Sequence, residues 1–236
     1  MNRITRIILR NLFRIPGYYF KLCRYARHPE RYTREETWAY IHKVLKQVLA
    51  TSNVELEVTG TEYLQPNQGF MLYGNHQGMF DVVAIAATCP YPLSIVYKKE
   101  LKNIPLLKQI LKCTNSYAMD REDVRQSLTV IQNVTRQVQE GHPYVIFPEG
   151  TRSKLSNDML EFHGGSFRCA LKAKCAVVPF ALVDCYKAFD QKGSKPMKAQ
   201  IHYLPTIPYE EYGHMKSGEV ADLVKGRIAE AIETHQ

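Results

Sequence analysis

The chain has 236 residues, which is long enough to bury a full-sized hydrophobic core as one domain or as one domain with an appendage. Its composition, 45% hydrophobic and 23% charged with no low-complexity tract or internal repeat, excludes a disordered or fibrous protein. The formal net charge is +8, and the longest apolar run, residues 176–183, is far shorter than the roughly 20 residues that span a bilayer. No transmembrane helix is predicted.

The cysteines and the N-terminal sequence indicate a reducing compartment. None of the 6 cysteines forms a C-x-x-C pair, so no structural zinc is expected from their spacing. The opening MNRITRIILRNLF interrupts its apolar residues with arginines, and it therefore lacks the apolar core of a secretion signal. We expect free thiols and a cytoplasmic location.

The first 29 residues form a strongly basic head with seven positive charges and no acid. Its apolar residues recur at helical spacing, and its first arginines follow the other side of the same helix. The apolar positions are Ile4, Ile7, Ile8, Leu12 and Ile15, and the arginines are Arg3, Arg6, Arg10 and Arg14. Pro16 and Gly17 are expected to break this helix, and aromatic and basic residues alternate after them.

An amphipathic helix of this kind suits an anionic membrane surface. Its apolar side would enter the acyl boundary while the arginines meet the headgroups, so the protein is expected to sit peripherally on the cytoplasmic face of a membrane. One alternative is a helix whose apolar side docks on the protein's own core and whose arginines are solvated. A nucleic-acid-binding arm is disfavoured because no RNP, zinc-finger or helix-turn-helix pattern accompanies the arginines.

The body of the chain begins after a helix that Thr33 and Glu36 open as a capping box and that ends near residue 50. We therefore divide the chain into an N-terminal helical segment, 1–50, and an α/β domain, 51–236. The predicted strands are 54–58, 70–73, 93–97, 116–119, 144–147, 176–183 and 199–204. The predicted helices are 79–88, 103–112, 121–140, 164–175 and 218–234. This alternation predicts an α/β fold with a mostly parallel central sheet flanked by helices.

Polar sequences follow three of the predicted strands. GNHQGMFD (74–81) follows the strand at 70–73, Asp120 and Arg121 follow 116–119, and PEGTRS (148–153) follows 144–147. Ligands of parallel sheets bind outside the carboxyl ends of the strands. The sequence therefore predicts that these residues meet at one edge of the sheet.

His76 and Asp81 are five residues apart, which on a continuous helix would set them about 140° apart around the axis. They can touch only if the chain turns between them, and Gly78 is expected to permit that turn. Asp81 in the first helical turn would then accept the imidazole Nδ1–H and leave Nε2 as a general base. The chain has no G-x-S-x-G elbow and no cysteine beside this motif, so the base would act on the substrate's own hydroxyl.

Arginine is the side chain best suited to hold a phosphate, because its planar fork matches two phosphate oxygens. Arg152 stands in a tight loop after a buried strand, and Arg121 stands at the start of a predicted helix. An ordinary solvent-facing arginine remains the alternative at both positions.

These residues resemble the motifs of a known family, the glycerolipid acyltransferases. NHQGMFD resembles the family's H-x4-D motif and FPEGTRS its motif of the same letters. The 98–105 segment with 118–121 looks like its second motif, and Val178-Pro179 like its fourth. Together they are most similar to bacterial 1-acyl-sn-glycerol-3-phosphate acyltransferases.

The resemblance implies a reaction and a set of site residues. His76 would deprotonate the sn-2 hydroxyl of lysophosphatidic acid, Asp81 would orient the imidazole, and phosphatidic acid would be the product. The implied substrate-binding residues are Arg121, Glu149, Gly150, Thr151 and Arg152. The acyl donor would be an acyl-CoA or acyl carrier protein thioester, with no metal, cofactor or covalent acyl-enzyme.

Three alternatives stay open at this point. The acceptor could be another lysophospholipid or glycerol 3-phosphate, which the motif residues do not distinguish. The chain could be a non-catalytic lipid-binding protein at a membrane surface. It could also be a metal hydrolase that uses His76, Asp81 and Glu149.

Overall fold

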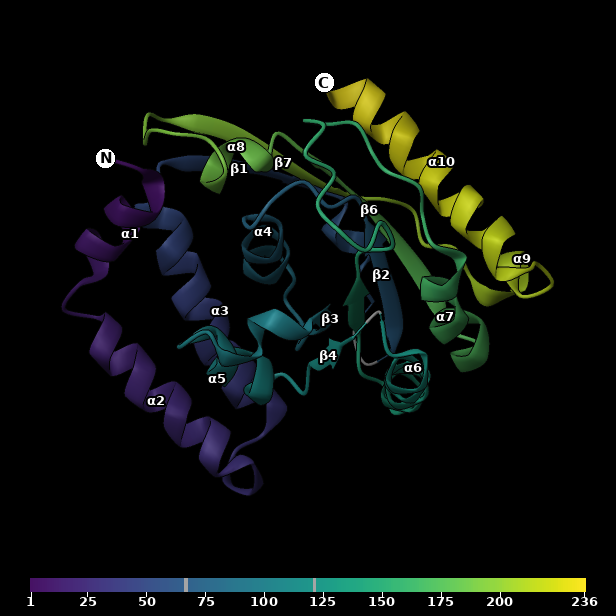
Figure 1. Cartoon of the computed structure of the whole chain (residues 1–236), viewed down its shortest axis with the longest axis horizontal. Coiled ribbons are helices and arrows are strands. Elements are labelled where there is room, and N and C mark those ends of the chain that lie inside the picture. The colour runs from purple at the N-terminus through teal and green to yellow at the C-terminus, as the bar shows by residue number, and fades with distance from the viewer. Residues whose placement is uncertain (66–67, 121) are drawn as a thin grey trace.

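The computed structural model describes residues 1–65, 68–120 and 122–236. Its central sheet has seven strands within those residues, in the order β1-β7-β6-β2-β5-β3-β4 (Figure 1). The strands are β1 (Val54–Thr59), β2 (Phe70–Gly74), β3 (Ser94–Lys98), β4 (Tyr117–Met119), β5 (Tyr144–Ile146), β6 (Ala176–Val183) and β7 (Met197–Tyr203). Each of the predicted strands is present, and the predicted α/β class is confirmed.

The sheet is parallel except at one pairing. β6 and β7 are antiparallel, whereas β1–β7, β6–β2, β2–β5, β5–β3 and β3–β4 are parallel. The connection between β6 and β7, residues 184–196, contains only the short helix α8 and returns the chain at the same edge of the sheet instead of crossing it. This leaves β2, β5, β3 and β6 with their carboxyl ends at the same edge.

Helices cover both faces of the sheet (Figure 1). The α-helices are α1 (Arg3–Asn11), α2 (Ile15–Arg27), α3 (Arg34–Thr51), α4 (Asp81–Thr88), α5 (Leu107–Cys113), α6 (Val124–Gln139), α7 (Arg168–Ala173), α8 (Tyr186–Phe189), α9 (Tyr209–Tyr212) and α10 (Ser217–His235). Short 3₁₀ helices are η1 (Pro29–Arg31), η2 (Thr61–Tyr63), η3 (Lys99–Asn103) and η4 (Gly164–Phe167). The predicted helix at 103–112 begins only at Leu107, as α5, the predicted helix at 164–175 is split into η4 and α7, and α8 and α9 were not predicted.

The two faces of the sheet bury two separate hydrophobic clusters. Along β2, Met71 and Tyr73 join the cluster under α6, α7 and α10, while Phe70 and Leu72 join the cluster under α2, α3 and α4. Successive side chains of a strand point to opposite faces, so a strand buried on both sides is apolar throughout. This is why β2 and β6 appear in the sequence as uninterrupted apolar runs.

The predicted helix over residues 34–50 is present as α3. Thr33 and Glu36 form both bonds of its capping box, from Glu36 N–H to Thr33 Oγ1 at 3.1 Å and from Thr33 N–H to Glu36 Oε2 at 2.9 Å. Its residues Trp38 and Ile41 share a core cluster with strands β2 and β6. The division at residue 50 therefore falls at the end of a helix that is packed on the sheet.

The N-terminal head folds as two helices, and the predicted break at Pro16 and Gly17 is misplaced. The chain turns at residues 12–14, and Pro16 lies in the first turn of α2. Proline is tolerated there because its missing N–H would have no partner within the helix and its fixed φ suits the first turn.

The polar side of α1, not its apolar side, docks on the body. Arg3 is 5% exposed and donates to the carbonyl oxygens of Ala188, Ser52, Asn53 and Lys195 at 2.8–3.2 Å. The expectation that Arg3 faces headgroups is therefore wrong, since its guanidinium is committed to backbone carbonyls. The large apolar side chains of the head left exposed are Ile4, Ile8, Leu9, Leu12, Phe13, Tyr19 and Phe20. Among the described residues, no helix is long and apolar enough to span a membrane.

Candidate active site

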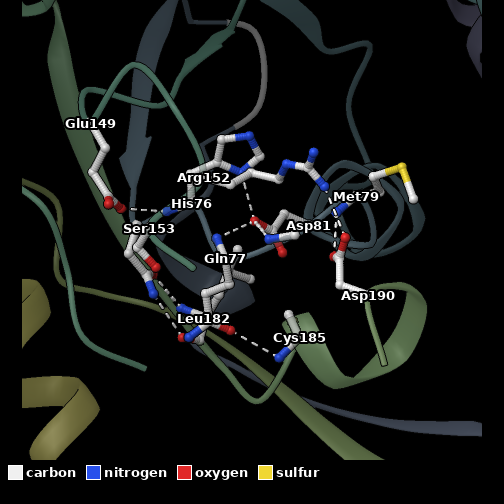
Figure 2. A network of polar contacts seen from close by, with 12 residues as sticks. His76, Gln77, Met79, Asp81, Glu149, Arg152, Ser153, Leu182, Cys185 and Asp190 are labelled. Carbon is white, nitrogen blue, oxygen red and sulfur yellow. Dashed lines mark hydrogen bonds and ion pairs between the residues drawn. The ribbon is translucent and has the colours of Figure 1, made fainter. Parts of the chain in front are cut away.

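His76 and Asp81 meet at the carboxyl end of β2. His76 lies two residues after the strand, Asp81 is the first residue of α4, and His76 Nδ1 lies 2.7 Å from Asp81 Oδ2 (Figure 2). The same Oδ2 accepts the backbone N–H groups of Gln77 at 2.6 Å and Gly78 at 2.9 Å. The chain between them is thus wrapped around one carboxylate oxygen, and the predicted contact is present.

Gly78 is needed in this loop for space and not for its backbone angles. Its φ is not among the positive values, whereas a Cβ at this position would lie 2.3 Å from Asp190 Oδ2 and 3.2 Å from Tyr186 Cα. The sequence suggested that this position needs a backbone conformation that only glycine adopts easily. The structure shows a different reason: the β6–β7 connection lies so close that a side chain at residue 78 would clash with it.

The contact with Asp81 fixes the chemistry of the ring. Asp81 is completely buried, and burial raises the pKa of its carboxyl, while the bonds from His76, Gly78 and Gln77 act in the opposite direction. With Asp81 as acceptor, the ring proton lies on Nδ1 and the lone pair on Nε2. The side chain of His76 is 21% exposed, and its ring stacks on Phe147 with 4.2 Å between centroids. This is a fixed imidazole with one free basic nitrogen.

Buried amides hold the loop on both sides of His76. The Asn75 side chain exchanges two bonds with the backbone of Leu182, at 2.9 and 2.8 Å. The Gln77 side chain donates to Asn157 Oδ1 at 2.7 Å and accepts the N–H of Cys185 at 2.9 Å. Both amide residues are at least 97% buried, so the loop is tied to β6 through groups that water does not reach. Sequence reasoning missed them, although both stand in the GNHQ motif.

Glu149 ties the second motif to the first. Its carboxylate accepts the N–H of His76 at 2.6 Å through Oε1 and the N–H of Leu160 at 2.9 Å through Oε2. It is 2% exposed, and burial raises its pKa against the effect of the two N–H groups. The Ser153 N–H also donates to the His76 carbonyl at 2.8 Å. The FPEGTRS loop therefore braces the His76 backbone, and each carboxylate oxygen of Glu149 accepts a backbone N–H group.

The remaining predicted substrate-binding residues that the structure describes lie near this brace. Arg152 precedes Ser153, and its Nη1 lies 2.8 Å from Asp190 Oδ1 (Figure 2). Thr151 is exposed, and Gly150 has a φ of 72°, which a residue without a Cβ adopts at little cost. Arg121 falls outside the described residues. Its predicted role stays a prediction.

One cysteine does lie beside the motif in space, contrary to the sequence-based expectation. Cys185 contacts Gln77 through its backbone, and its side chain is fully buried. Burial, with the nearby Asp81 and Asp184 carboxylates, raises the pKa of the Cys185 thiol well above its ordinary value. Since the thiolate is the nucleophilic form of cysteine, this thiol is unsuited to attack an acyl group.

No group of three or more His, Cys, Asp or Glu side chains among the described residues could hold a metal ion. A groove of about 860 Å³ runs along α3 beside the loops before β3 and β5, at the opposite edge of the sheet from His76. None of the predicted site residues that the structure describes lines this groove.

The chain is similar to known acyltransferases. The Acyltransferase family model matches residues 55–183, more than half of the chain and the part that carries both motifs. A protein of Helicobacter pylori named 1-acyl-sn-glycerol-3-phosphate acyltransferase is 32% identical over 138 residues, which are 58% of this chain and 57% of that protein. A protein of the same name from Borreliella burgdorferi is 24% identical over 192 residues, 80% of this chain and 76% of that protein.

A solved structure shares the whole fold. The crystal structure of the 1-acyl-sn-glycerophosphate (LPA) acyltransferase PlsC from Thermotoga maritima matches with a TM-score of 0.73 and 20% identity, over 97% of both chains. At this identity the match establishes the fold, and it includes the N-terminal helices. The family match over residues 55–183 confirms the family predicted from the sequence: the chain belongs to the Acyltransferase family.

Proposed function

We propose that this protein transfers a fatty acyl group from a thioester to the sn-2 hydroxyl of lysophosphatidic acid and releases phosphatidic acid. The observation that carries the proposal is the His76–Asp81 contact of 2.7 Å, braced by the same loop that bears Arg152. The family membership and the names of its relatives in Helicobacter and Borreliella support the acyl-transfer class and the acceptor.

The proposed chemistry needs one base and no enzyme nucleophile. His76 Nε2 takes the proton of the acceptor hydroxyl while the hydroxyl oxygen attacks the thioester carbonyl. Asp81 stabilises the imidazolium that forms, since its carboxylate accepts the Nδ1–H. Collapse of the tetrahedral intermediate expels the thiolate, which takes the proton back from Nε2. The ring returns to its starting state.

Arg152 is the described side chain best placed to hold the acceptor's phosphate. Its loop is joined to the His76 backbone by Ser153, so a phosphate on its guanidinium would lie near the base. We propose the same role for Arg121. Glu149 and Gly150 would act through the shape of the loop, and Thr151 through its exposed position beside the phosphate.

We further propose that α1 and α2 attach the protein to an anionic membrane surface. Their exposed side carries large apolar residues together with Arg10, Arg14, Lys21 and Arg24, which are also exposed. Apolar groups that enter the acyl boundary beside cations that meet phosphates suit an anionic bilayer. The apolar side of α1 does not dock on the body, because Arg3 and Asn11 make its contacts there, whereas α2 buries Leu22 and Ala26 against the body.

The decisive experiment is acyl transfer by the His76→Ala variant. With lysophosphatidic acid and an acyl-CoA or acyl carrier protein thioester, we expect thiol release to fall by about 10²–10⁴-fold while circular dichroism and the urea midpoint stay those of the parent. Undiminished transfer would remove His76 as the base. A parent chain that transfers no acyl group with either donor would favour a non-catalytic lipid-binding protein.

The same assay separates the remaining alternatives. Glycerol 3-phosphate and other lysophospholipids, offered with one donor, identify the acceptor. A metal hydrolase predicts that a chelator abolishes activity. It would also require Glu149 to leave two backbone N–H groups at 2.6 and 2.9 Å.

A further inference from the structure

The carboxylate of Asp190 lies beside the candidate active site, in contact with two groups that can bind an anion. It follows α8 directly, and its Oδ1 lies 2.8 Å from Arg152 Nη1 (Figure 2). Its Oδ2 accepts the backbone N–H of Met79 at 3.2 Å. Met79 precedes Phe80, the N-cap residue of α4, so this N–H lies near the positive end of the helix dipole, which favours negative charge. A guanidinium and a helix N-terminus thus converge on one internal carboxylate.

These are the donors that the proposed phosphate of the acceptor would use. We propose that the Asp190 carboxylate and the phosphate of the acceptor compete for Arg152, and that the phosphate displaces the carboxylate when the acceptor binds. This inference rests on the proposed function. It makes Asp190 a residue that sets the apparent affinity for phosphate-bearing acceptors.

The contact is suited to exchange. The side chains of Arg152 and Asp190 are 38% and 31% exposed, and ion pairs open to water contribute only about 0–1 kcal/mol. A phosphate offers more charge and three oxygens to the guanidinium fork, so it competes well against one carboxylate. Residues 191–196 after Asp190 contain no helix or strand, so the carboxylate can move away without disturbing β6 or β7.

The loop is also shaped to admit this carboxylate. Gly78 leaves room for it, since a Cβ there would lie 2.3 Å from Asp190 Oδ2. A bound phosphate would use the same space above the Gly78–Met79 backbone. If Asp190 remained in place, its charge would repel the phosphate. Removal of the charge therefore relieves both competition and repulsion.

The test is a kinetic comparison of the full-length parent with Asp190→Asn, which keeps the size and a hydrogen-bond acceptor. We expect the KM for lysophosphatidic acid to fall about two- to fivefold, the change that the loss of an exposed ion pair produces. The kcat and the KM for the thioester should stay those of the parent. Inorganic phosphate, used as a competitive inhibitor, should bind more tightly by the same factor.

The matched control is Glu211→Gln. Glu211 on α9 pairs with Arg227 on α10, is exposed, and gives the same change of net charge at the edge of the sheet opposite His76. We expect this variant to leave all four constants unchanged. If it lowers the KM as much as Asp190→Asn does, the effect arises from overall charge and the proposal is overturned.

The opposite outcome is equally informative. If Asp190 instead holds Arg152 in its working position, Asp190→Asn raises the KM or lowers kcat, and Asp190→Glu restores it. An unchanged KM also overturns the proposal. If the parent transfers no acyl group, the proposed function fails, but thermal unfolding in inorganic phosphate still tests the inference. Phosphate should then stabilise Asp190→Asn more than the parent, and equal stabilisation would refute it.

Discussion

Two regions of this protein reverse the usual placement of polar and apolar groups, in opposite ways. The loop from 74 to 81 buries the side-chain amides of Asn75 and Gln77 and the carboxylate of Asp81. Among the described residues, no group forms a hydrogen bond with Asp81 Oδ1. The α1–α2 pair buries Arg3 and Asn11 and exposes Phe13 and Phe20. Buried polar groups are costly unless hydrogen-bonded, and exposed apolar clusters are uncommon on monomers.

The difference lies in what each region keeps fixed. In the 74–81 loop the hydrogen bonds fix a single side chain, His76, so that one nitrogen is free. In α1 the hydrogen bonds fix the whole helix by its polar side, so that its apolar side is free. Removal of a group from the first region should therefore stop chemistry, whereas removal from the second should stop attachment to a surface.

The largest effect is expected from Asp81→Asn. The amide has the size of the carboxylate but cannot stabilise an imidazolium by charge, and it no longer selects the Nδ1–H form of His76. We expect kcat to fall by about 10²–10⁴-fold at an unchanged KM for the acceptor. The measurement is steady-state thiol release.

The fold of Asp81→Asn should survive. Burial raises the pKa of the Asp81 carboxyl, so the charged form is already disfavoured there by desolvation, and a neutral amide relieves that cost. The urea midpoint of the variant is the control. A kcat within about tenfold of the parent would mean that His76 works without the carboxylate.

A smaller effect is expected from Phe13→Ser combined with Phe20→Ser. Phe13 is 97% and Phe20 70% exposed, so neither contributes to the core, and burial of a phenylalanine side chain is worth about 1.5–3 kcal/mol. We expect binding to anionic liposomes in a flotation assay to weaken by about tenfold or more. The free energy of unfolding without liposomes should not change.

The matched control for that pair is Val58→Ser, an exposed apolar residue near the carboxyl end of the edge strand β1. It should leave liposome binding unchanged. Equal binding by the double phenylalanine variant and its parent would show that α1 and α2 are not the attachment surface.

Much of this architecture could be predicted from the sequence, because it depends on local pattern. Short apolar runs and alternating apolar and polar residues located the strands, and the capping box located the start of α3. The requirement that His76 and Asp81 meet through a turn followed from helical geometry alone, and their atoms lie 2.7 Å apart. The residues of the two motifs indicated the family.

What failed depends on contacts distant in sequence. An apolar run does not encode strand direction, so the antiparallel pairing of β6 with β7 could not be predicted. A helical pattern distinguishes the two sides of α1 but does not show which side contacts the body. The polar side does so because Arg3 donates to four backbone carbonyl groups of segments distant in sequence. Asp190 lies 38 residues after Arg152, and no motif links them.

The smallest effect concerns pH and a histidine outside both regions. His202 on β7 is 1% exposed and lies 2.8 Å from Thr59 Oγ1 through Nδ1 and 2.9 Å from Gln200 Oε1 through Nε2. Burial, together with His235 stacked on the ring at 3.8 Å, lowers its pKa below 6.5, and Glu57 opposes this only in part. Between the lowered value and 6.5 the unfolded chain binds more protons than the folded one, so the free energy of unfolding falls as pH falls.

We expect His202→Asn to be less stable than the parent at pH 7.5 but to lose less stability on acidification, as measured by urea unfolding. Burial also lowers the pKa of His42 and of His142, so both groups add to the pH dependence of the parent and of the variant. The test is therefore the difference between the two free energies of unfolding at each pH. If the free energy of unfolding has the same slope against pH in both proteins, His202 is not the group that titrates.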